Sequence, residues 1–253
     1  MRLTIIGCSG SMPGPESAAS CYLVEAPYAG RTFRLVLDLG SGALGTLQRF
    51  VALDTVDAVA LSHLHADHCL DLCGYYVFRK YHPGGPLPHV TVYGPEGTAQ
   101  RMARAYDLPD EPGMSDVFSF VPYADSTMEI GPFSVDVARV HHPVPAYAVR
   151  VSHDGRSLVY TGDTGPCSSL DDLAKGCDLL LAESSFVEGG RHNPMDMHLT
   201  GRQAALTAER AGVGQLVLTH IPPWHDREVV RSEAVPHFAG PVSLAVTGAS
   251  YDL

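Results

Sequence analysis

The sequence has no long hydrophobic run and no excess of basic residues. No stretch approaches the roughly 18 consecutive apolar residues of a membrane-spanning helix, and the apolar part of the opening MRLTIIGCSG is too short for a signal peptide. The 17 basic residues are outnumbered by 28 acidic ones, which gives a net charge of -11. Because affinity for a phosphate backbone comes mainly from clustered Lys and Arg, long nucleic acids are poor candidates for partners. We expect a cytoplasmic protein without a membrane segment.

Patterned cysteines, repeats and linkers are also missing. The six cysteines contain no C-x-x-C pair, which argues against a disulfide framework or a structural zinc knuckle and indicates reduced, mostly buried thiols. Charges are evenly spread, and no low-complexity tract or repeat marks a linker. With 253 residues, of which 45% are hydrophobic, the chain can bury a substantial core. We therefore predict a single domain that covers residues 1–253.

What the sequence does contain is an alternation of short apolar, β-branched runs with helical patterns. The best helix covers 200–212, with Thr200 as its N-cap and Gly212 at its end. Two further helices are expected within 40–50 and 95–106. This order favours an α/β protein, a four-layer α/β/β/α sandwich. The predicted strands are 3–7, 21–25, 33–38, 57–62, 89–94, 117–122, 133–140, 146–152, 157–163, 178–183 and 215–220.

Four potential metal ligands crowd the end of the predicted strand 57–62. They form the pattern His63-x-His65-x-Asp67-His68, at the kind of strand end where open α/β folds commonly place their sites. Imidazole and carboxylate groups together suit zinc or a related divalent ion. The four cannot all bind one ion, because consecutive side chains point in different directions. Further ligands must come from elsewhere in the chain.

Three later strands also end in such residues. His142 follows strand 133–140, Asp163 closes strand 157–163, and His220 closes strand 215–220. His141 is an alternative to its neighbour His142. These positions are the further candidate ligands, each at the end of a predicted strand.

With these residues the chain resembles the metallo-β-lactamase superfamily, whose motif is H-x-H-x-D-H followed by a distant His, Asp and His. It is most similar to the ribonuclease Z-like phosphodiesterase branch. The stretch HPVPAYAVR fits the branch pattern that begins with the third histidine, which favours His142. The resemblance implies two divalent ions, zinc by preference with manganese as the alternative. It implies that one ion is held by His63, His65 and His142, the other by Asp67, His68 and His220, and that Asp163 bridges both.

The resemblance also implies a catalytic set. Asp67 would orient the attacking water as a base. The motifs E-S-S-F at 183–186 and H-L-T at 198–200 match paired signatures of this branch, in which His198 would protonate the leaving oxygen and Glu183 would orient His198. Asp38 matches an early aspartate that orients the ligands, and GCSGSMPG resembles a glycine-rich loop beside the substrate.

The segment between the third histidine and the bridging aspartate bears on the substrate. Bacterial tRNA 3'-processing ribonuclease Z usually carries a long arm there, whereas only residues 143–162 separate His142 from Asp163. The stretches HLHADHCLDL, GCSGSMPGPES, DMHLTG and LTHIPPW resemble actinobacterial atypical class II cyclic-nucleotide phosphodiesterases. Aromatic side chains that could stack on a base occur just past His220 and in an expected helix after the histidine motif: Trp224, Tyr75, Tyr76, Phe78, Tyr81 and His82. Most of them are expected in the helix core, which leaves Trp224 and His82 as weak candidates.

The resemblance therefore predicts a small phosphodiester substrate. The expected reaction is hydrolysis of 3',5'-cyclic AMP to 5'-AMP by a hydroxide held between the two ions. The alternatives are a tRNA 3'-processing endoribonuclease and another hydrolase of this fold, such as a lactonase or thioesterase. The family resemblance also implies a homodimer.

Overall fold

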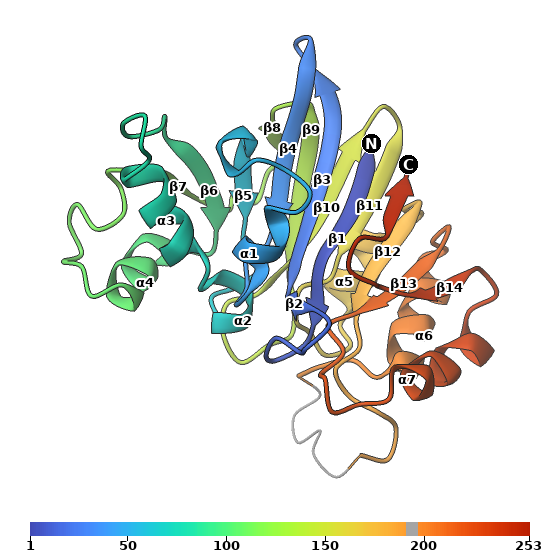
Figure 1. Ribbon diagram of the computed structural model, residues 1–253. Helices are drawn as coiled ribbons and strands as arrows, with labels where there is room; N and C mark the ends of the chain where they lie inside the picture. Colours follow the sequence, from blue (N-terminus) through green and yellow to red (C-terminus); the bar gives the residue numbers. More distant parts are fainter. Residues whose placement is uncertain (191–196) are drawn as a thin grey trace.

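The computed structural model describes residues 1–190 and 197–253, which form two β-sheets packed face to face (Figure 1). Asp196, the first residue of the DMHLTG stretch, lies outside the described residues. The chain builds the two sheets almost one after the other. Only its last strand returns from the second sheet to the first.

The first sheet consists of β1 (Arg2–Ser9), β2 (Ala18–Ala19), β3 (Cys21–Tyr28), β4 (Arg31–Leu37), β5 (Ala58–Ala60), β6 (Val90–Gly94), β7 (Phe118–Pro122) and β15 (Ser250–Asp252). Its order is β15-β1-β3-β4-β5-β6-β7, with β2 paired to β1. β4 to β7 run parallel, so their carboxyl ends meet at one edge.

The second sheet consists of β8 (Met128–Ile130), β9 (Phe133–Arg139), β10 (Tyr147–His153), β11 (Arg156–Tyr160), β12 (Leu179–Glu183), β13 (Leu216–Thr219) and β14 (Val242–Leu244). Its order is β14-β13-β12-β11-β10-β9-β8. β8 to β11 form antiparallel hairpins, as the close spacing of the predicted strands suggests, and β11 to β14 are parallel.

The core between the sheets is made by the inward-facing side chains of both. Leu35 and Tyr22 from the first sheet pack in one buried cluster with Leu158 and Tyr160 from the second. The rings of Tyr22 and Tyr160 lie with their centroids 4.8 Å apart. Burial of such large apolar groups is the main force that holds two sheets together.

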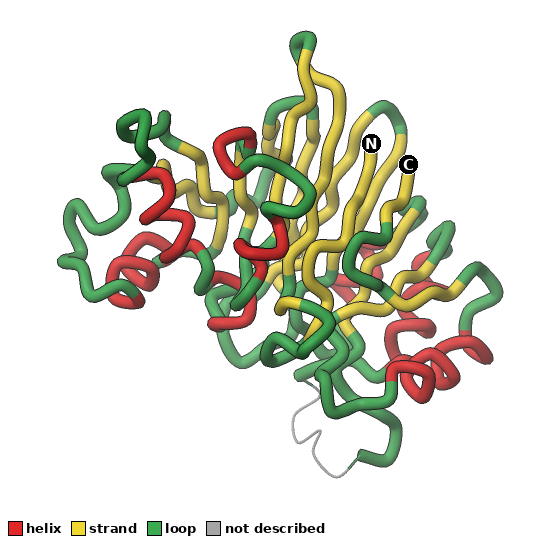
Figure 2. The backbone as a smooth tube through the Cα atoms, in the orientation of Figure 1, coloured by secondary structure: helices red, strands yellow, loops and turns green. Residues whose placement is uncertain are grey.

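Helices cover the outer face of each sheet, and Figure 2 shows them on both sides of the strands. This confirms the predicted α/β/β/α layering. The first sheet is covered by α1 (Ala43–Leu47), α3 (Leu72–Lys80) and α4 (Thr98–Ala105), with α2 (Ala66–Cys69) and the 3-10 turn η1 (Leu53–Thr55) beside them. The second sheet is covered by α5 (Ser168–Ala174), α6 (Gly201–Ala211) and α7 (Arg227–Ala234), followed by η2 (Val235–His237).

The predicted strands 33–38 and 215–220 are correct in position. In the structure, however, β4 ends at Leu37 and β13 at Thr219, one residue before the predicted ends. Asp38 and His220 follow these strands in the left-handed backbone conformation, with φ of 56° and 54°. Few residues other than glycine adopt this conformation. It turns both side chains out of their strands, and the two residues lie at the carboxyl ends where the metal-ligand candidates gather.

The helix predicted for 200–212 is confirmed, including both of its ends. Thr200 Oγ1 accepts from the Gln203 backbone N–H at 3.2 Å, and Gln203 Oε1 accepts from the Thr200 N–H at 2.9 Å. Gly212 ends the helix in the left-handed conformation, with φ of 64°. The reciprocal pair is a capping box, which satisfies two backbone donors that the helix leaves free.

We expect Thr200→Ala to lower the free energy of unfolding by about 1 kcal/mol, because the N-cap hydrogen bond is lost. Urea unfolding followed by circular dichroism measures the change. Ser232→Ala, at an exposed position on α7, serves as the control and should unfold at the native midpoint. An unchanged midpoint for Thr200→Ala would mean that the cap does not stabilise α6.

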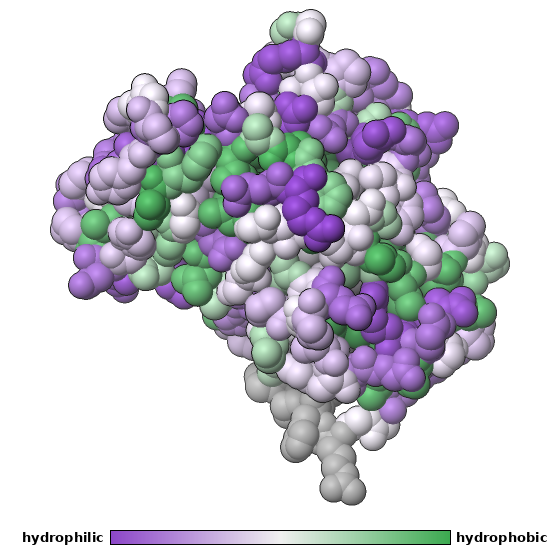
Figure 3. All heavy atoms as spheres, in the orientation of Figure 1, coloured by the Kyte–Doolittle hydropathy of each residue, from purple (hydrophilic) through white to green (hydrophobic). Residues whose placement is uncertain are grey.

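The last features of the fold are its helix lengths, its surface and its cysteines. Within 1–190 and 197–253, no helix is long and apolar enough to cross a membrane. Figure 3 shows polar and apolar side chains interspersed over the visible face. All six cysteines are free and most are buried, as predicted.

Candidate metal centre

The predicted ligands come together from both sheets at the edge where parallel strands end. The first sheet contributes the segment after β5, which turns into α2, and the second sheet contributes the segments after β9, β11 and β13. His142, and not the exposed His141, belongs to the cluster. The side chains brought together are those of His63, His65, Asp67, His68, His142, Asp163 and His220.

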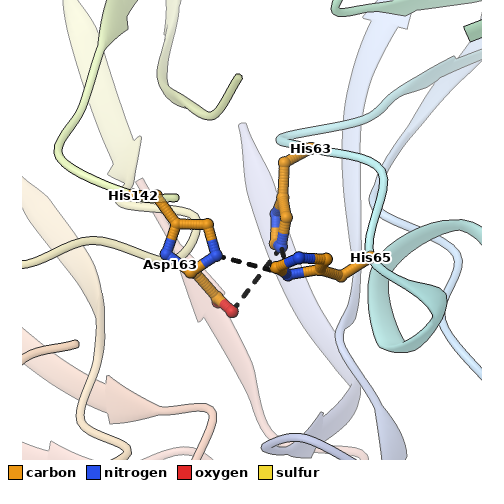
Figure 4. Close-up of side chains that lie close together, drawn as sticks. All are labelled: His63, His65, His142 and Asp163. Carbon is orange, nitrogen blue, oxygen red and sulfur yellow. Dashed lines mark hydrogen bonds and ion pairs between the residues drawn. The ribbon is translucent and has the colours of Figure 1, made fainter. Parts of the chain in front are cut away.

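One group of donors consists of three histidines and an aspartate, which converge in Figure 4. His65 Nδ1 lies 3.0 Å from His63 Nε2 and 3.3 Å from His142 Nε2. His63 Nε2 lies 3.7 Å from Asp163 Oδ2. All four donor atoms lie within 4.8 Å of one another, which is close enough for one ion to contact them all.

The second group shares Asp163 with the first. His220 Nε2 lies 3.2 Å from both Asp67 Oδ2 and His68 Nε2. His68 Nε2 and His220 Nε2 lie 3.2 Å and 3.5 Å from Asp163 Oδ1. The two oxygens of Asp163 therefore face different groups, as a carboxylate that bridges two ions would.

A buried oxygen without a partner supports the fit of a cation. Asp163 is 2% exposed, and no group in the described part of the chain donates to its Oδ1 in hydrogen-bond geometry. A buried carboxylate oxygen left in this state is costly unless a positive charge compensates it. Together with the nitrogen and oxygen donors around it, this oxygen fits a site for divalent metal ions.

A hydrogen-bond network behind the centre sets the orientation of two histidines. The fully buried Asp38 accepts from His68 Nδ1 and from the Tyr160 hydroxyl, each at 2.7 Å. Ser62 Oγ donates to Asp38 at 2.7 Å, so it accepts from His63 Nδ1 at 3.1 Å. His63 then directs an unprotonated Nε2 toward the centre, and the bond from His68 Nδ1 to Asp38 turns His68 Nε2 toward the same point. Sequence reasoning identified Asp38 but missed Ser62 and Tyr160.

A third histidine is oriented by the backbone. His142 Nδ1 donates to the Met197 carbonyl at 3.2 Å, which leaves its Nε2 for the centre. Burial lowers the pKa of His142, and the same cause lowers the pKa of His63 and of His65. These imidazoles are therefore held in the neutral form that binds metals.

The charges around His68 favour a cation at the centre. Burial alone lowers the pKa of His68, but Asp163 and Asp38 outweigh it and raise the pKa well above its ordinary value. Burial likewise raises the pKa of Asp163, and the imidazoles of His220 and His68 outweigh it and hold that pKa well below its usual range. The Asp163 carboxylate is thus ionised and attracts positive charge, which a divalent ion would supply.

Glu183 and His198 form a pair beside this centre. His198 Nδ1 donates to Glu183 Oε1 at 2.8 Å. The backbone N–H groups of Thr164 and Ser185 donate to the two oxygens of the fully buried Glu183, at 2.9 Å and 3.0 Å. Burial lowers the pKa of His198, but Glu183 outweighs it and raises that pKa to about 9. The pair therefore holds an imidazole proton.

The ring of His198 lies next to the metal-ligand candidates. Its centroid is 5.8 Å from that of His220, in a stacked arrangement, and its Nδ1 is 4.0 Å from Asp163 Oδ2. The ring of Phe186 packs edge-on against it at 5.0 Å. Although Glu183, His198 and His220 also lie close enough to hold an ion, the three donors to Glu183 already occupy its carboxylate. This arrangement suits proton transfer better than metal binding.

The aromatic candidates lie outside this cluster. Tyr75 and Tyr76 lie on the buried face of α3 and pack into the core, where they stabilise the fold. His82 follows α3, and its ring contacts Phe78 at 5.4 Å. Trp224 is 62% exposed. Within the part of the chain that the structure describes, none of these side chains forms a hydrogen bond or ring contact with the metal-ligand candidates, so no base-binding role follows from their positions.

A two-sheet α/β sandwich with clustered histidines and aspartates at its strand ends defines a protein of the metal-dependent hydrolase class. Comparison with family models agrees, because residues 34–221 match the beta-lactamase superfamily domain. The chain therefore belongs to the beta-lactamase superfamily and is a metallo-hydrolase of that fold. The resemblance predicted from the histidine motif is confirmed.

Three relatives show how far the similarity extends. An uncharacterized protein of Mycobacterium tuberculosis is 44% identical over 260 residues, which cover 100% of this chain and 92% of the relative. The probable metallo-hydrolase YhfI of Bacillus subtilis is 31% identical over 251 residues, covering 98% of each. Its crystal structure superposes with a TM-score of 0.87 at 28% identity, over 99% of each chain. Ribonuclease Z of Mycobacterium marinum is 32% identical over 278 residues, covering 96% of this chain and 95% of the relative.

Proposed function

We propose that this chain is a binuclear metal-dependent phosphodiesterase that hydrolyses 3',5'-cyclic nucleotides, with cyclic AMP converted to 5'-AMP. The observation that carries the proposal is the arrangement at Asp163, which belongs to both donor groups. Its Oδ2 lies 4.0 Å from Nδ1 of His198, the histidine that holds a proton. Two zinc ions fit the nitrogen and oxygen donors, with manganese as the alternative.

In this proposal the two ions occupy the two donor groups. When bound, they generate a nucleophile from water near neutral pH and neutralise charge on the phosphoryl oxygens. His63, His65 and His142 would hold one ion and Asp67, His68 and His220 the second, and Asp163, which belongs to both donor groups, would serve both.

Asp67 orients the attacking water and accepts its proton. Its side chain is 13% exposed, whereas those of Asp163 and His220 are 3% and 1% exposed. Asp67 therefore faces the space that a substrate enters more than its neighbours do. The imidazoles of His220 and His68 outweigh the effect of burial and hold the pKa of Asp67 far below its usual range, so the carboxylate is ionised.

His198 protonates the leaving group. As the water oxygen bonds to phosphorus, the bond from phosphorus to the 3' oxygen breaks, and the departing oxygen takes the proton of His198 Nε2. Glu183 accepts the hydrogen bond from Nδ1 at 2.8 Å and so fixes the ring while stabilising its charged form. An alkoxide leaving group needs such an acid, whereas a thiolate does not, which supports a phosphodiester over a thioester.

The segment between His142 and Asp163 supports a small substrate. It contains only the antiparallel hairpin of β10 and β11, whose turn lies at Asp154 and Gly155. No arm projects from this hairpin to hold a large RNA. The net charge of -11 also disfavours a long nucleic acid.

A tRNA 3'-processing endoribonuclease is the second candidate. The specific observation in its favour is the 32% identity with ribonuclease Z of Mycobacterium marinum across most of both chains. The chemistry at the metal centre would be the same. The two candidates differ in the surface that grips the substrate.

We expect the metal-loaded protein to convert cyclic AMP to 5'-AMP and to leave a tRNA precursor with a 3' trailer intact. Both substrates are incubated with the same preparation, and the products are separated by chromatography and gel electrophoresis. A lactone and a thioester are tested alongside. Cleavage of the precursor without turnover of cyclic AMP would identify the endoribonuclease instead, and turnover of only the lactone or thioester would contradict phosphodiesterase activity.

Three expectations from the sequence belong to this proposal. The chain acts as a single domain over 1–253, as a cytoplasmic enzyme and as a homodimer. Light scattering of the purified protein tests the last of these.

A further inference from the structure

The side chain of Ser185 holds His220 at two points. Ser185 follows β12 and is buried, 2% exposed. Its Oγ lies 2.6 Å from His220 Nδ1 and 2.9 Å from the His220 carbonyl oxygen. Both contacts join residues that lie on neighbouring strand ends of the second sheet.

The hydrogen-bond roles of these contacts follow from proton counting. A carbonyl oxygen only accepts, so the single hydroxyl proton of Ser185 is donated to the His220 carbonyl. Ser185 Oγ must then accept from His220 Nδ1, which carries the ring proton. His220 Nε2 is left unprotonated, and it is the atom that faces Asp67 and Asp163, at 3.2 Å and 3.5 Å.

The backbone of His220 has an unfavourable conformation and is tightly enclosed, which is the setting of its two contacts with Ser185. Its φ of 54° is unfavourable for a histidine. A Cβ atom added to Gly10 would lie only 2.2 Å from the His220 carbonyl oxygen, so the glycine-rich loop packs directly against this residue. Ser185 fixes the carbonyl and the ring together in this narrow space.

Each donor group has its own orienting partners. Asp38 and Ser62 orient His68 and His63, and the Met197 carbonyl orients His142. In the part of the chain that the structure describes, the hydrogen-bond partner of His220 Nδ1 is Ser185. Loss of its hydroxyl should therefore affect one ion more than the other.

We propose that Ser185 is a positioning residue that fixes the tautomer and ring orientation of His220 and thereby determines the affinity of the ion held with Asp67 and His68. This inference rests on the proposed metal centre. Metal binding is its readout, so the identity of the substrate does not affect the test.

We expect Ser185→Ala to weaken one of the two metal-binding steps by about 10- to 100-fold and to leave the other unchanged, the usual effect of removing a partner behind a metal ligand. Zinc is titrated into metal-free protein against a competing chelator. Ser184→Ala is the matched control, because Ser184 is equally buried and its hydroxyl donates to the Glu183 carbonyl at 2.7 Å. It should bind both ions with native affinity.

Two more variants separate a positioning role from a general loss of packing. Ser185→Thr keeps the hydroxyl and should restore most of the affinity. In a His220→Ala background, Ser185→Ala should cause no further weakening, because its effect passes through the imidazole. Circular dichroism of each metal-free variant checks that it folds.

The outcomes distinguish this inference from the proposed function. If the native chain binds two ions and Ser185→Ala binds them equally well, the positioning role is wrong and the metal centre stands. If both binding steps weaken equally, the role is structural and the inference fails. The same holds if Ser185→Ala still lowers the metal affinity in the His220→Ala background. A native chain that binds no metal overturns the proposed function itself.

Discussion

Replacing His198 with alanine should lower kcat for cyclic AMP by about 10²- to 10⁴-fold, the usual contribution of a general acid, while both metal ions remain bound. The reason is that the 3' alkoxide would leave without a proton. None of the donor atoms of the proposed metal ligands is removed. Steady-state kinetics and metal analysis of the same preparation measure the two effects.

The leaving group provides the control for this prediction. Bis(p-nitrophenyl) phosphate releases p-nitrophenolate, which is stable without a proton, so His198→Ala should lose little activity toward it. His82→Ala, whose ring packs on Phe78 beyond α3, should retain activity toward both substrates. Equal losses for cyclic AMP and the nitrophenyl ester in His198→Ala would contradict the role of general acid.

Replacing Asp163 with asparagine should abolish binding of at least one ion and lower activity by about 1,000-fold or more, because the electrostatic contribution of metal ions is worth several kcal/mol. Among the described residues, one donor group contains His63 and another contains His68. Asp163 is the only residue that belongs to both of these groups. Asparagine keeps the shape of the side chain but removes its negative charge, so the change tests charge and not packing.

His142→Ala is the comparison for this variant. His142 belongs only to the group with His63 and His65, so its loss should weaken one ion and leave the other bound. Metal analysis after dialysis gives the stoichiometry of both variants. Two ions retained by Asp163→Asn, with native activity, would exclude the bridging role.

The sequence predicted the parts of the site that are local or that follow strands. His63 to His68 form a dense pattern that few other functions require, and His220 was found because it follows an apolar run. The fold could be predicted for the same reason, since alternating strands and helices leave strong periodic signals. The short helices α5 and α7 and the short strands β14 and β15 were not predicted, because so few residues carry little periodicity.

The residues behind the candidate metal ligands could not be predicted from local pattern. Tyr160 meets Asp38 across the two sheets, although 122 positions separate them in the chain. Ser185 and His220 are 35 positions apart. Nothing in a buried tyrosine or serine distinguishes a partner of a ligand from an ordinary core residue. Only the packing of the sheets reveals these contacts.

The division of the ligands between the sheets has a consequence for biosynthesis. The first sheet, apart from β15, comes from residues 2–122, and the second comes from residues 128–244. A chain leaving the ribosome therefore exposes His63 to His68 well before His220 has been made. No nascent fragment that ends before His220 can assemble both donor groups. If activity needs both donor groups, as proposed, hydrolysis can begin only after His220 has been translated.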